Sequence, residues 1–340
     1  MDSNRWATVL GFAGALAVLA ALLWLVGVGD LVDALAAVRP PSLAVILATA
    51  VLWLVAWGLA LRTVLGALGQ RVQVHVAALV FAAAVFSNNV TPFGQAGGEP
   101  VTAYLVSQAT DSEYETGLAA IASVDALHFV PSVGFAIAGL TFVAVGRVTL
   151  GRNLLYATAA VGVLVVALPV AAYLGWRYRY ELEAAVVRVL TPLLRGIGRA
   201  LPRRSPPGPG VIEGRIETFF GAIDRVAGDR GTLLSAIGFS ALGWLLLCAS
   251  LWLSAYALGF SISFAAVMLV VPIGAIAGIT PLPGGLGGVE TVLVALLVST
   301  TGLASGVAGA AVLVHRGATY WFPTVVGGGV AFALGLGDHL

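Results

Sequence analysis

The chain has 340 residues, of which 59% are hydrophobic and only 10% are charged, with a mean hydropathy of +1.00 and a formal net charge of +1. This composition is typical of an integral membrane protein and excludes an ordinary soluble globular domain. All seventeen basic residues are arginines, so a Walker A phosphate loop, which requires a lysine, is excluded, and the single Cys248 excludes an internal disulfide or a cysteine metal site.

Six apolar runs are long enough to cross the hydrocarbon core of a membrane, which requires about 20 residues of helix. The first run follows Arg5, and because it is longer than the apolar core of a signal peptide, about 7–15 residues, we expect an uncleaved first span. The predicted spans cover residues 6–28, 42–65, 116–145, 153–175, 232–258 and 305–335. The sequence therefore predicts an all-α polytopic membrane protein with about six transmembrane helices.

Two further apolar regions, 72–108 and 262–300, are each interrupted in the middle by the same motif. The motif reads Thr-Pro, a glycine-rich break, Gly-Gly and a glutamate, and its copies are Thr91–Glu99 and Thr280–Glu290. The apolar arm on either side of each motif is too short to cross the membrane easily as a helix. We therefore predict two re-entrant helical hairpins whose broken tips lie at membrane depth. Such backbone is tolerated there only where it is buried in protein or lines a polar cavity.

Residues 176–230 form the one clearly polar segment, with ten arginines against six acidic residues. The excess of positive charge predicts that this segment is cytoplasmic, by the positive-inside rule. A Pro- and Gly-rich break at 205–210 divides it into two amphipathic stretches. The stretch 182–201 is expected to lie along the inner leaflet, and a solvated linker that only joins the two halves is an equal alternative.

Counting spans from this linker predicts that both termini are cytoplasmic in a multi-pass protein of the cell membrane. The first hairpin then enters the membrane from the cytoplasm and the second from outside, so the unit at 42–145 recurs upside down at 232–335. An inverted repeat whose discontinuous helices meet near the midplane is the architecture of secondary transporters, with the substrate site between the repeats. The predicted organisation is an N-terminal membrane half at 1–175, the linker at 176–230 and a C-terminal membrane half at 231–340.

The two motifs supply the first group of candidate site residues. Glu99 and Glu290 each follow a Gly-Gly pair at the expected start of a half-helix, where a carboxylate can cap the helix, bind a proton or bind a cationic headgroup. The free N–H groups at such helix starts form an anion site. Asn88 and Asn89 add polar lining, whereas the glycines alternatively serve only to let membrane helices pack closely. The glycines assigned to the site are Gly97, Gly98, Gly287 and Gly288.

The spans that follow the hairpins supply the second group. Asp125 and His128 lie one turn apart in the first of these spans, and His315, Arg316 and Tyr320 lie at the corresponding depth in the second. A charge inside the membrane costs about 2.5–3.5 kcal/mol on insertion scales, so it usually faces the bundle interior and is paired. We expect Asp125 and Arg316 to face one another or a common cavity, either as a structural ion pair or as a site in which Arg316 binds a phosphate.

Other kinds of chemistry find little support in the sequence. The four histidines show no metal-ligand spacing, so no metal or other cofactor is predicted. Two G-x-G-D patterns, at 27–30 and 335–338, resemble an intramembrane aspartyl protease motif, but both aspartates fall at span ends. No G-x-S-x-G nucleophile motif is present, and topology explains the linker arginines better than nucleic-acid binding does. The chain is therefore not expected to be an enzyme.

Three ordered motifs resemble one family of membrane proteins. They are Asn88-Asn89-x-x-Pro92-x-Gly94-x-x-Gly97-Gly98-Glu99, Pro281-x-Pro283-Gly284-Gly285-x-Gly287-x-x-Glu290 and Arg316-x-x-x-Tyr320-Trp321-x-Pro323. With these motifs most of the chain is similar to the flippase-like family named after the transmembrane region of lysylphosphatidylglycerol synthase. The resemblance implies translocation of lipids between leaflets, either of aminoacylated phospholipids or of polyprenyl-phosphate sugar carriers in glycan assembly.

The chain departs from this family in two respects. The soluble aminoacyltransferase domain of the synthase is absent from the 340 residues, and Ser123-Val124-Asp125 stands where the family frequently has a Glu-Arg pair. We therefore expect a stand-alone lipid translocator whose partner is a membrane lipid, either an anionic phospholipid or a polyprenyl-phosphate lipid. The alternatives are a transporter of a small soluble anion and a membrane scaffold that binds a glycosyltransferase or a lipid synthase.

Overall fold

The computed structural model describes residues 38–91, 94–145, 209–279 and 282–337, together with Ala36 and isolated positions between 159 and 181. All regular secondary structure in these residues is helical, as the sequence predicts. The predicted span 6–28 and the amphipathic stretch 182–201 lie outside the described residues. So does the predicted span 153–175, apart from the isolated positions.

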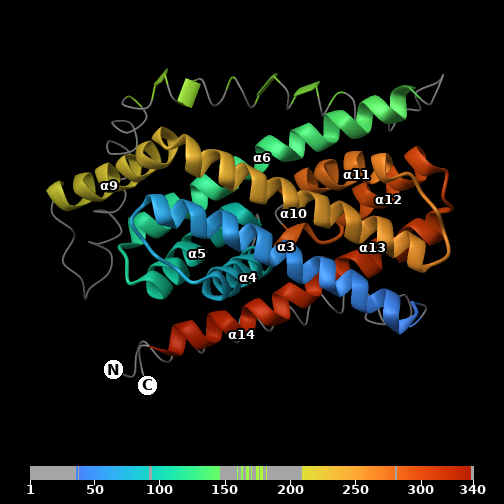
Figure 1. Cartoon of the computed structure of the whole chain (residues 1–340), viewed down its shortest axis with the longest axis horizontal. Coiled ribbons are helices and arrows are strands. Elements are labelled where there is room, and N and C mark those ends of the chain that lie inside the picture. The colour runs from blue at the N-terminus through green and yellow to red at the C-terminus, as the bar shows by residue number, and fades with distance from the viewer. Residues whose placement is uncertain are drawn as a thin grey trace.

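The described helices form two series that are joined by a helix at the end of the linker (Figure 1). The first series is α3 (Pro40–Ala67), α4 (Val74–Val90), α5 (Gln95–Thr110) and α6 (Tyr114–Val145). The joining helix is α9 (Pro209–Gly228). The second series is α10 (Arg230–Ala257), α11 (Phe264–Ile276), η1 (Ala277–Ile279), η2 (Pro283–Gly285), α12 (Gly288–Thr301), α13 (Ser305–Arg316), η3 (Gly317–Trp321) and α14 (Phe322–Gly337).

α3 and α10 are the matching long helices of the two series, with 28 residues each. After both helices a glycine, Gly69 (φ 84°) or Gly259 (φ 90°), takes the left-handed conformation that other residues rarely adopt. The next N–H then bonds back to the helix, to the carbonyl of Leu65 at 2.9 Å or of Ala255 at 3.0 Å. α3 and α10 share the most extensive contact between described helices, and they run antiparallel (Figure 1).

Three of the predicted spans are confirmed as long apolar helices. The spans predicted at 42–65, 116–145 and 232–258 correspond to α3, α6 and α10. Each of these helices is long and apolar enough to cross a membrane. The chain is therefore a multi-pass membrane protein.

The predicted span 305–335 is helical, but it contains a π-helical turn. α13, η3 and α14 follow one another without leaving helical backbone conformation, and the N–H of Phe322 bonds to the carbonyl of Gly317. Pro323 has no N–H for the carbonyl of Thr319, and its ring would clash with that carbonyl in a regular α-helix. Because π-helical turns often mark functional sites, this one directs attention to the residues around it.

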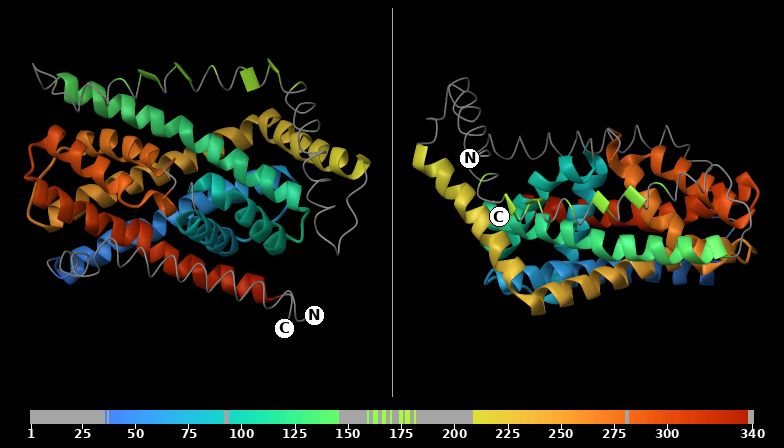
Figure 2. Two further views of the ribbon diagram at one scale, coloured as in Figure 1. Left: turned by 180° about the vertical axis from the view of Figure 1, so that it is seen from behind. Right: turned by 90° about the horizontal axis from the view of Figure 1, so that it is seen from above.

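Each predicted hairpin region consists of two short helices and an irregular tip. The pairs are α4 with α5 and α11 with α12, and their arms have 13 to 17 residues. At 1.5 Å per residue these arms reach about 20–26 Å, less than the ~30 Å hydrocarbon core. When η2 is counted with α12, the segment Pro283–Thr301 reaches 19 residues and is long enough for a span. The two pairs lie beside opposite ends of α3 and α10 (Figures 1 and 2).

The packing between the two series is reciprocal. α4 packs on α14, and α11 packs on α6. When the two series are matched in chain order, these are the same contact with the halves exchanged. A glycine allows each contact: a Cβ on Gly327 of α14 would lie 1.9 Å from the carbonyl oxygen of Ala82, and a Cβ on Gly139 of α6 would lie 2.5 Å from the amide nitrogen of Leu269.

The end of the predicted linker is α9, which packs against α6. Its buried face carries Ile216, Ala222 and Val226. On its exposed side Arg215 forms an ion pair of 3.1 Å with Glu115, in the first turn of α6. This part of the linker is therefore attached to the helical bundle.

Candidate functional site

The two glycine-rich tips meet inside the bundle. A Cβ on Gly94, in the tip between α4 and α5, would lie 3.1 Å from the carbonyl oxygen of Gly278, in the tip between α11 and α12. A Cβ on Gly284 would likewise lie 3.1 Å from the Cα atom of Asn89. Since each tip contains glycine at the point of contact, the two backbones approach more closely than larger residues would allow.

A cavity of about 510 Å³ lies at this meeting point and is lined by residues of both halves. This volume is within the range of small-molecule sites, about 300–1,000 Å³. Aromatic side chains of α3, α4 and α10 form part of its wall. The polar and charged residues that line it are Asn88, Asn89, Glu99, Asp125, His128, Ser132, His315, Arg316 and Thr319.

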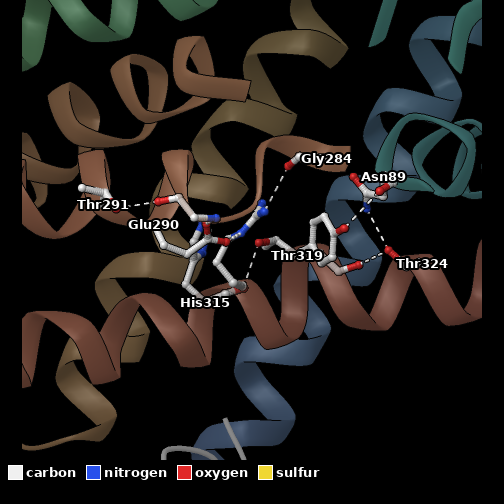
Figure 3. A network of polar contacts seen from close by, with 10 residues as sticks. Asn89, Gly284, Glu290, Thr291, His315, Thr319 and Thr324 are labelled. Carbon is white, nitrogen blue, oxygen red and sulfur yellow. Dashed lines mark hydrogen bonds and ion pairs between the residues drawn. The ribbon is translucent and has the colours of Figure 1, made fainter. Parts of the chain in front are cut away.

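Two hydrogen bonds hold Arg316 at the tip of the second hairpin, to Glu290 and Gly284, which are labelled in Figure 3. Its Nε atom donates to Glu290 Oε1 at 2.6 Å, and its Nη2 atom donates to the carbonyl of Gly284 at 3.3 Å. Glu290 also accepts the N–H of Gly287 at 2.7 Å, which is the capping arrangement that its position predicts. Arg316 and Asp125 line the same cavity, but Arg316 forms its ion pair with Glu290.

Tyr320 ties the π turn to the tip of the first hairpin. Its ring lies 4.3 Å from the guanidinium carbon of Arg316, and its hydroxyl donates to the carbonyl of Asn89 at 3.1 Å. The Asn89 side chain donates to the Thr324 hydroxyl at 2.8 Å, one turn further along (Figure 3). Arg316, Tyr320 and Thr324 thus connect α14 and the second tip to the first tip, and Tyr320 is buried between them.

The two candidate histidines are buried, and both bond to serines of α10. The Nδ1 atom of His128 lies 2.7 Å from the Ser240 hydroxyl, and that of His315 lies 3.0 Å from the Ser250 hydroxyl. The ring of His128 also stacks on Trp57 with 4.0 Å between ring centroids. Both histidines are therefore fixed in orientation on the central pair of long helices.

Asp125 and Glu99 form the acidic side of the cavity. Asp125 is 9% exposed, and its Oδ2 atom has no hydrogen-bond partner among the described residues. Glu99 lies in the second turn of α5, which begins at Gln95, so the expectation that it caps this helix from the first turn is wrong. Three further buried polar atoms without a described partner belong to residues that line the cavity: Trp53 Nε1, Asn88 Oδ1 and His128 Nε2.

The four glycines assigned to the site from the sequence do not line the cavity; they are positions where the helices start or pack closely. A Cβ on Gly98 would lie 2.0 Å from the Asn88 side chain, so this glycine lets α5 lie against α4. Gly287 precedes α12 with a φ of 80°, and Gly288 is the first residue of that helix. Gly97 lies within the first turn of α5 and is half-buried.

Sequence reasoning missed the tryptophans and serines that support the site. Trp57 donates to the carbonyl of Ser240 at 3.1 Å, and Trp244 donates to the carbonyl of His128 at 2.9 Å. Gly243 makes room for Trp57, because a Cβ there would lie 1.9 Å from the indole nitrogen. The available signal was the presence of serine and tryptophan within otherwise apolar spans, where a polar atom requires a partner.

The chain is similar to known membrane proteins over most of its length. The family described as "Lysylphosphatidylglycerol synthase TM region" matches residues 9–327. Two proteins of Methanothermobacter thermautotrophicus, each described as a UPF0104 membrane protein, are 24% identical over 331 residues and 26% identical over 321 residues. These matches cover 95% and 91% of this chain and 92% and 90% of the relatives. A UPF0104 membrane protein of Pyrococcus horikoshii is 25% identical over 252 residues, which is 72% of each chain.

Proposed function

Because the chain belongs to the family of the lysylphosphatidylglycerol synthase transmembrane region, we propose that it is a lipid translocator. In this proposal the polar headgroup of an anionic phospholipid or a polyprenyl-phosphate lipid passes through the cavity while the acyl chains stay in the bilayer. The observation that carries the proposal is a cavity of about 510 Å³, lined by buried charged groups, where two broken helices meet. Buried charges of this kind in a membrane protein usually mark the path of a substrate or an ion.

We further propose that the two series of helices are an inverted repeat with re-entrant hairpins. Three observations support it: α3 and α10 run antiparallel, the α4–α14 and α11–α6 contacts are reciprocal, and the hairpins lie beside opposite ends of the long helices. Each feature is expected of two halves related by a two-fold axis in the membrane plane. In such transporters the substrate site lies at the interface between the repeats, and this cavity is lined by residues of both series.

Arg316 is the proposed contact for the lipid phosphate. An arginine has five N–H donors, and the bonds to Glu290 and Gly284 use one on Nε and one on Nη2. The remaining donors are available for a phosphate, with Glu290 holding the guanidinium in place. The proposed cycle involves no chemical change of the lipid, so the protein acts as a transporter and not as an enzyme.

Lipid movement can be measured in liposomes that contain the purified protein and a labelled lipid. An impermeant reagent that destroys the label in the outer leaflet reports how much lipid has crossed. We expect protein-dependent crossing of an anionic phospholipid or a polyprenyl-phosphate lipid, with a strong decrease in Arg316→Ala. The matched control Glu217→Gln changes an exposed residue of α9 and is expected to retain activity. Folded protein that moves neither lipid class would contradict the proposal.

The same liposomes test the alternative substrate class. Uptake of labelled inorganic phosphate without any movement of lipid would instead indicate a transporter of small soluble anions. A scaffold role would give neither activity, together with stable copurification of a glycosyltransferase or a lipid synthase. The amount of apolar and aromatic surface in the cavity wall favours an amphiphilic substrate over a small anion.

A further inference from the structure

We propose that Glu99 and Asp125 share an exchangeable proton, so that the acidic side of the cavity is a proton-binding site. The inference concerns regulation of the cavity described above, and only its consequence for transport rests on the proposed function. Glu290 is not part of this pair, because its carboxylate is already bound to Arg316 and to the N–H of Gly287.

The two carboxyl groups come from neighbouring helices and line one cavity. Glu99 is on α5 and Asp125 is on α6, and these helices pack together. Neither forms an ion pair within the described part of the chain, and the Oδ2 atom of Asp125 is buried without a hydrogen-bond partner there.

The other charged and titratable groups of the cavity are bonded to partners other than this pair. Arg316 lines the cavity, but its Nε atom donates to Glu290 Oε1 at 2.6 Å. His128 and His315 also line the cavity, and each is bound through Nδ1 to a serine hydroxyl of α10.

The other helices packed on α6 also lack a counterion for the pair among their described residues. Arg62 of α3 donates to the carbonyl of Val72 at 2.8 Å. Arg215 of α9 is bound to Glu115 near the start of α6, and Arg225 of α9 is exposed. α11 carries no charged residue, and Arg230 of α10 is exposed at the first position of that helix. The pair therefore has no cation beside it in the described structure.

Two ionised carboxylates that line one cavity without a cation are strongly unfavourable inside a membrane protein. One proton removes one of the two negative charges. A hydronium ion transfers its proton to one carboxylate, which gives a carboxylic acid and water, and the reverse transfer restores the second negative charge. A cavity that changes charge in this way can bind or release a charged headgroup in step with a proton.

Infrared spectroscopy of the purified protein tests the inference without any transport assay, because a protonated carboxyl group has its own carbonyl band. We expect this band near neutral pH in the wild type, and its loss as the pH rises. We expect its loss at neutral pH in the double variant Glu99→Gln/Asp125→Asn, and its retention in the matched double variant Glu217→Gln/Asp224→Asn. The control changes two exposed acids of α9.

The single variants show which carboxyl group holds the proton. Loss of the band in Asp125→Asn alone or in Glu99→Gln alone assigns it to that residue, and loss in both indicates a shared proton. If Asp125→Asn does not fold, Asp125→Glu keeps a carboxyl group, and we expect a shifted band in this variant. A wild type without the band at neutral pH, or a band that survives in the folded double variant, overturns the inference. A band present in a protein that moves no lipid would leave this inference intact and contradict only the proposed function.

Discussion

Glu290 joins three parts of the site through one carboxylate. One oxygen binds Arg316 of α13, the other accepts the N–H of Gly287 at the start of α12, and Arg316 reaches on to Gly284 in the tip. Both side chains of the ion pair are largely buried, at 12% and 17% exposure. A pair of this kind contributes little net stability when intact, but removing one partner leaves a buried charge without compensation.

Changing either partner alone is therefore expected to destabilise the protein strongly. We predict a loss of about 3–5 kcal/mol for Arg316→Gln and for Glu290→Gln, and a loss smaller than the sum for the double variant. Unfolding of the purified proteins in detergent measures these differences. Arg215→Gln is the matched control, because Arg215 is 64% exposed in its pair with Glu115 and is expected to lose only about 0–1 kcal/mol. Equal effects of the Arg316 and Arg215 substitutions would contradict the prediction.

Asp229 gives the start of α10 a dependence on pH. Its carboxylate accepts the Thr232 hydroxyl at 2.7 Å and the N–H of Gly231 at 2.9 Å. These hydrogen bonds, that of Thr232 first, lower the pKa of Asp229 below its ordinary value of 3.8. Because the pKa is lowered in the folded state, the stabilisation is complete above pH 3.8 and is lost as the pH falls toward the lowered value.

The variant Asp229→Asn keeps a capping oxygen but cannot ionise. We predict that wild type is more stable than this variant above pH 3.8 and that the difference shrinks in stronger acid. Unfolding measured at several pH values gives the two curves. Curves that stay parallel through the acidic range would show that ionisation of Asp229 does not contribute.

The two motifs show how far single residues can be predicted. Both have Gly-Gly before a glutamate, yet Glu290 is the third residue of α12 and caps it, whereas Glu99 is the fifth residue of α5 and does not. The difference arises because α5 begins before its Gly-Gly pair, where Gly98 packs against Asn88 of α4. This packing depends on the tertiary structure, so the letter pattern alone could not distinguish the two roles.

At the level of elements, long apolar runs were predictable and the π turn was not. The bounds of α3, α6 and α10 lie within two residues of the predicted spans, because length and hydrophobicity determine them. The positions of the prolines did not predict where a helix departs from regular α-helical geometry. Pro131 lies within the α-helical α6, whereas Pro323 follows the π turn. Tyr320, within the π turn, is bonded to the first tip, and the sequence does not show this long-range contact.

The contact between α14 and α4 depends on the absence of a side chain at Gly327. A Cβ there would meet the carbonyl oxygen of Ala82, which cannot move away without shifting α4. We predict that Gly327→Ala destabilises the protein by about 1–3 kcal/mol. Gly329, two residues further on, has nothing within 4 Å of such a Cβ. Gly329→Ala is thus the matched control and is expected to be neutral or slightly stabilising, by up to about 1 kcal/mol.

Thermal unfolding in detergent compares these two variants directly. Alanine has the higher helix propensity at both positions, so propensity alone would make both substitutions favourable. A destabilised Gly327→Ala beside an unchanged Gly329→Ala isolates the packing effect. Similar stability of the two variants would mean that α14 does not approach α4 this closely in the membrane.

For the whole molecule, the order of helices was predictable but their mutual contacts were not. The repeated motif and charge counting indicated two comparable halves, whereas nothing in the sequence indicated that α4 packs on α14 and α11 on α6. These contacts are made between residues far apart in the chain. They place the residues before α4 and before α11 at opposite ends of the antiparallel α3–α10 pair (Figure 1).

The proposed inverted repeat makes a prediction about accessibility from the two sides of the membrane. Gln73 and Ser263 are exposed residues at matching positions, directly before α4 and α11. With Cys248 replaced by alanine, we expect Ser263→Cys to react with an impermeant maleimide in intact cells. Gln73→Cys should react only after permeabilisation, because the arginine-rich linker predicts that its side is cytoplasmic.

The exposed residues Glu113 and Ser305, which follow the two hairpins, extend this test. A chain that enters and leaves the membrane on one side must show Glu113→Cys reacting like Gln73→Cys, and Ser305→Cys like Ser263→Cys. The two pairs must then differ from each other, since the halves are inverted. Labelling of all four positions from the same side would mean that the antiparallel α3 and α10 do not both cross the membrane, and the inverted repeat would have to be abandoned.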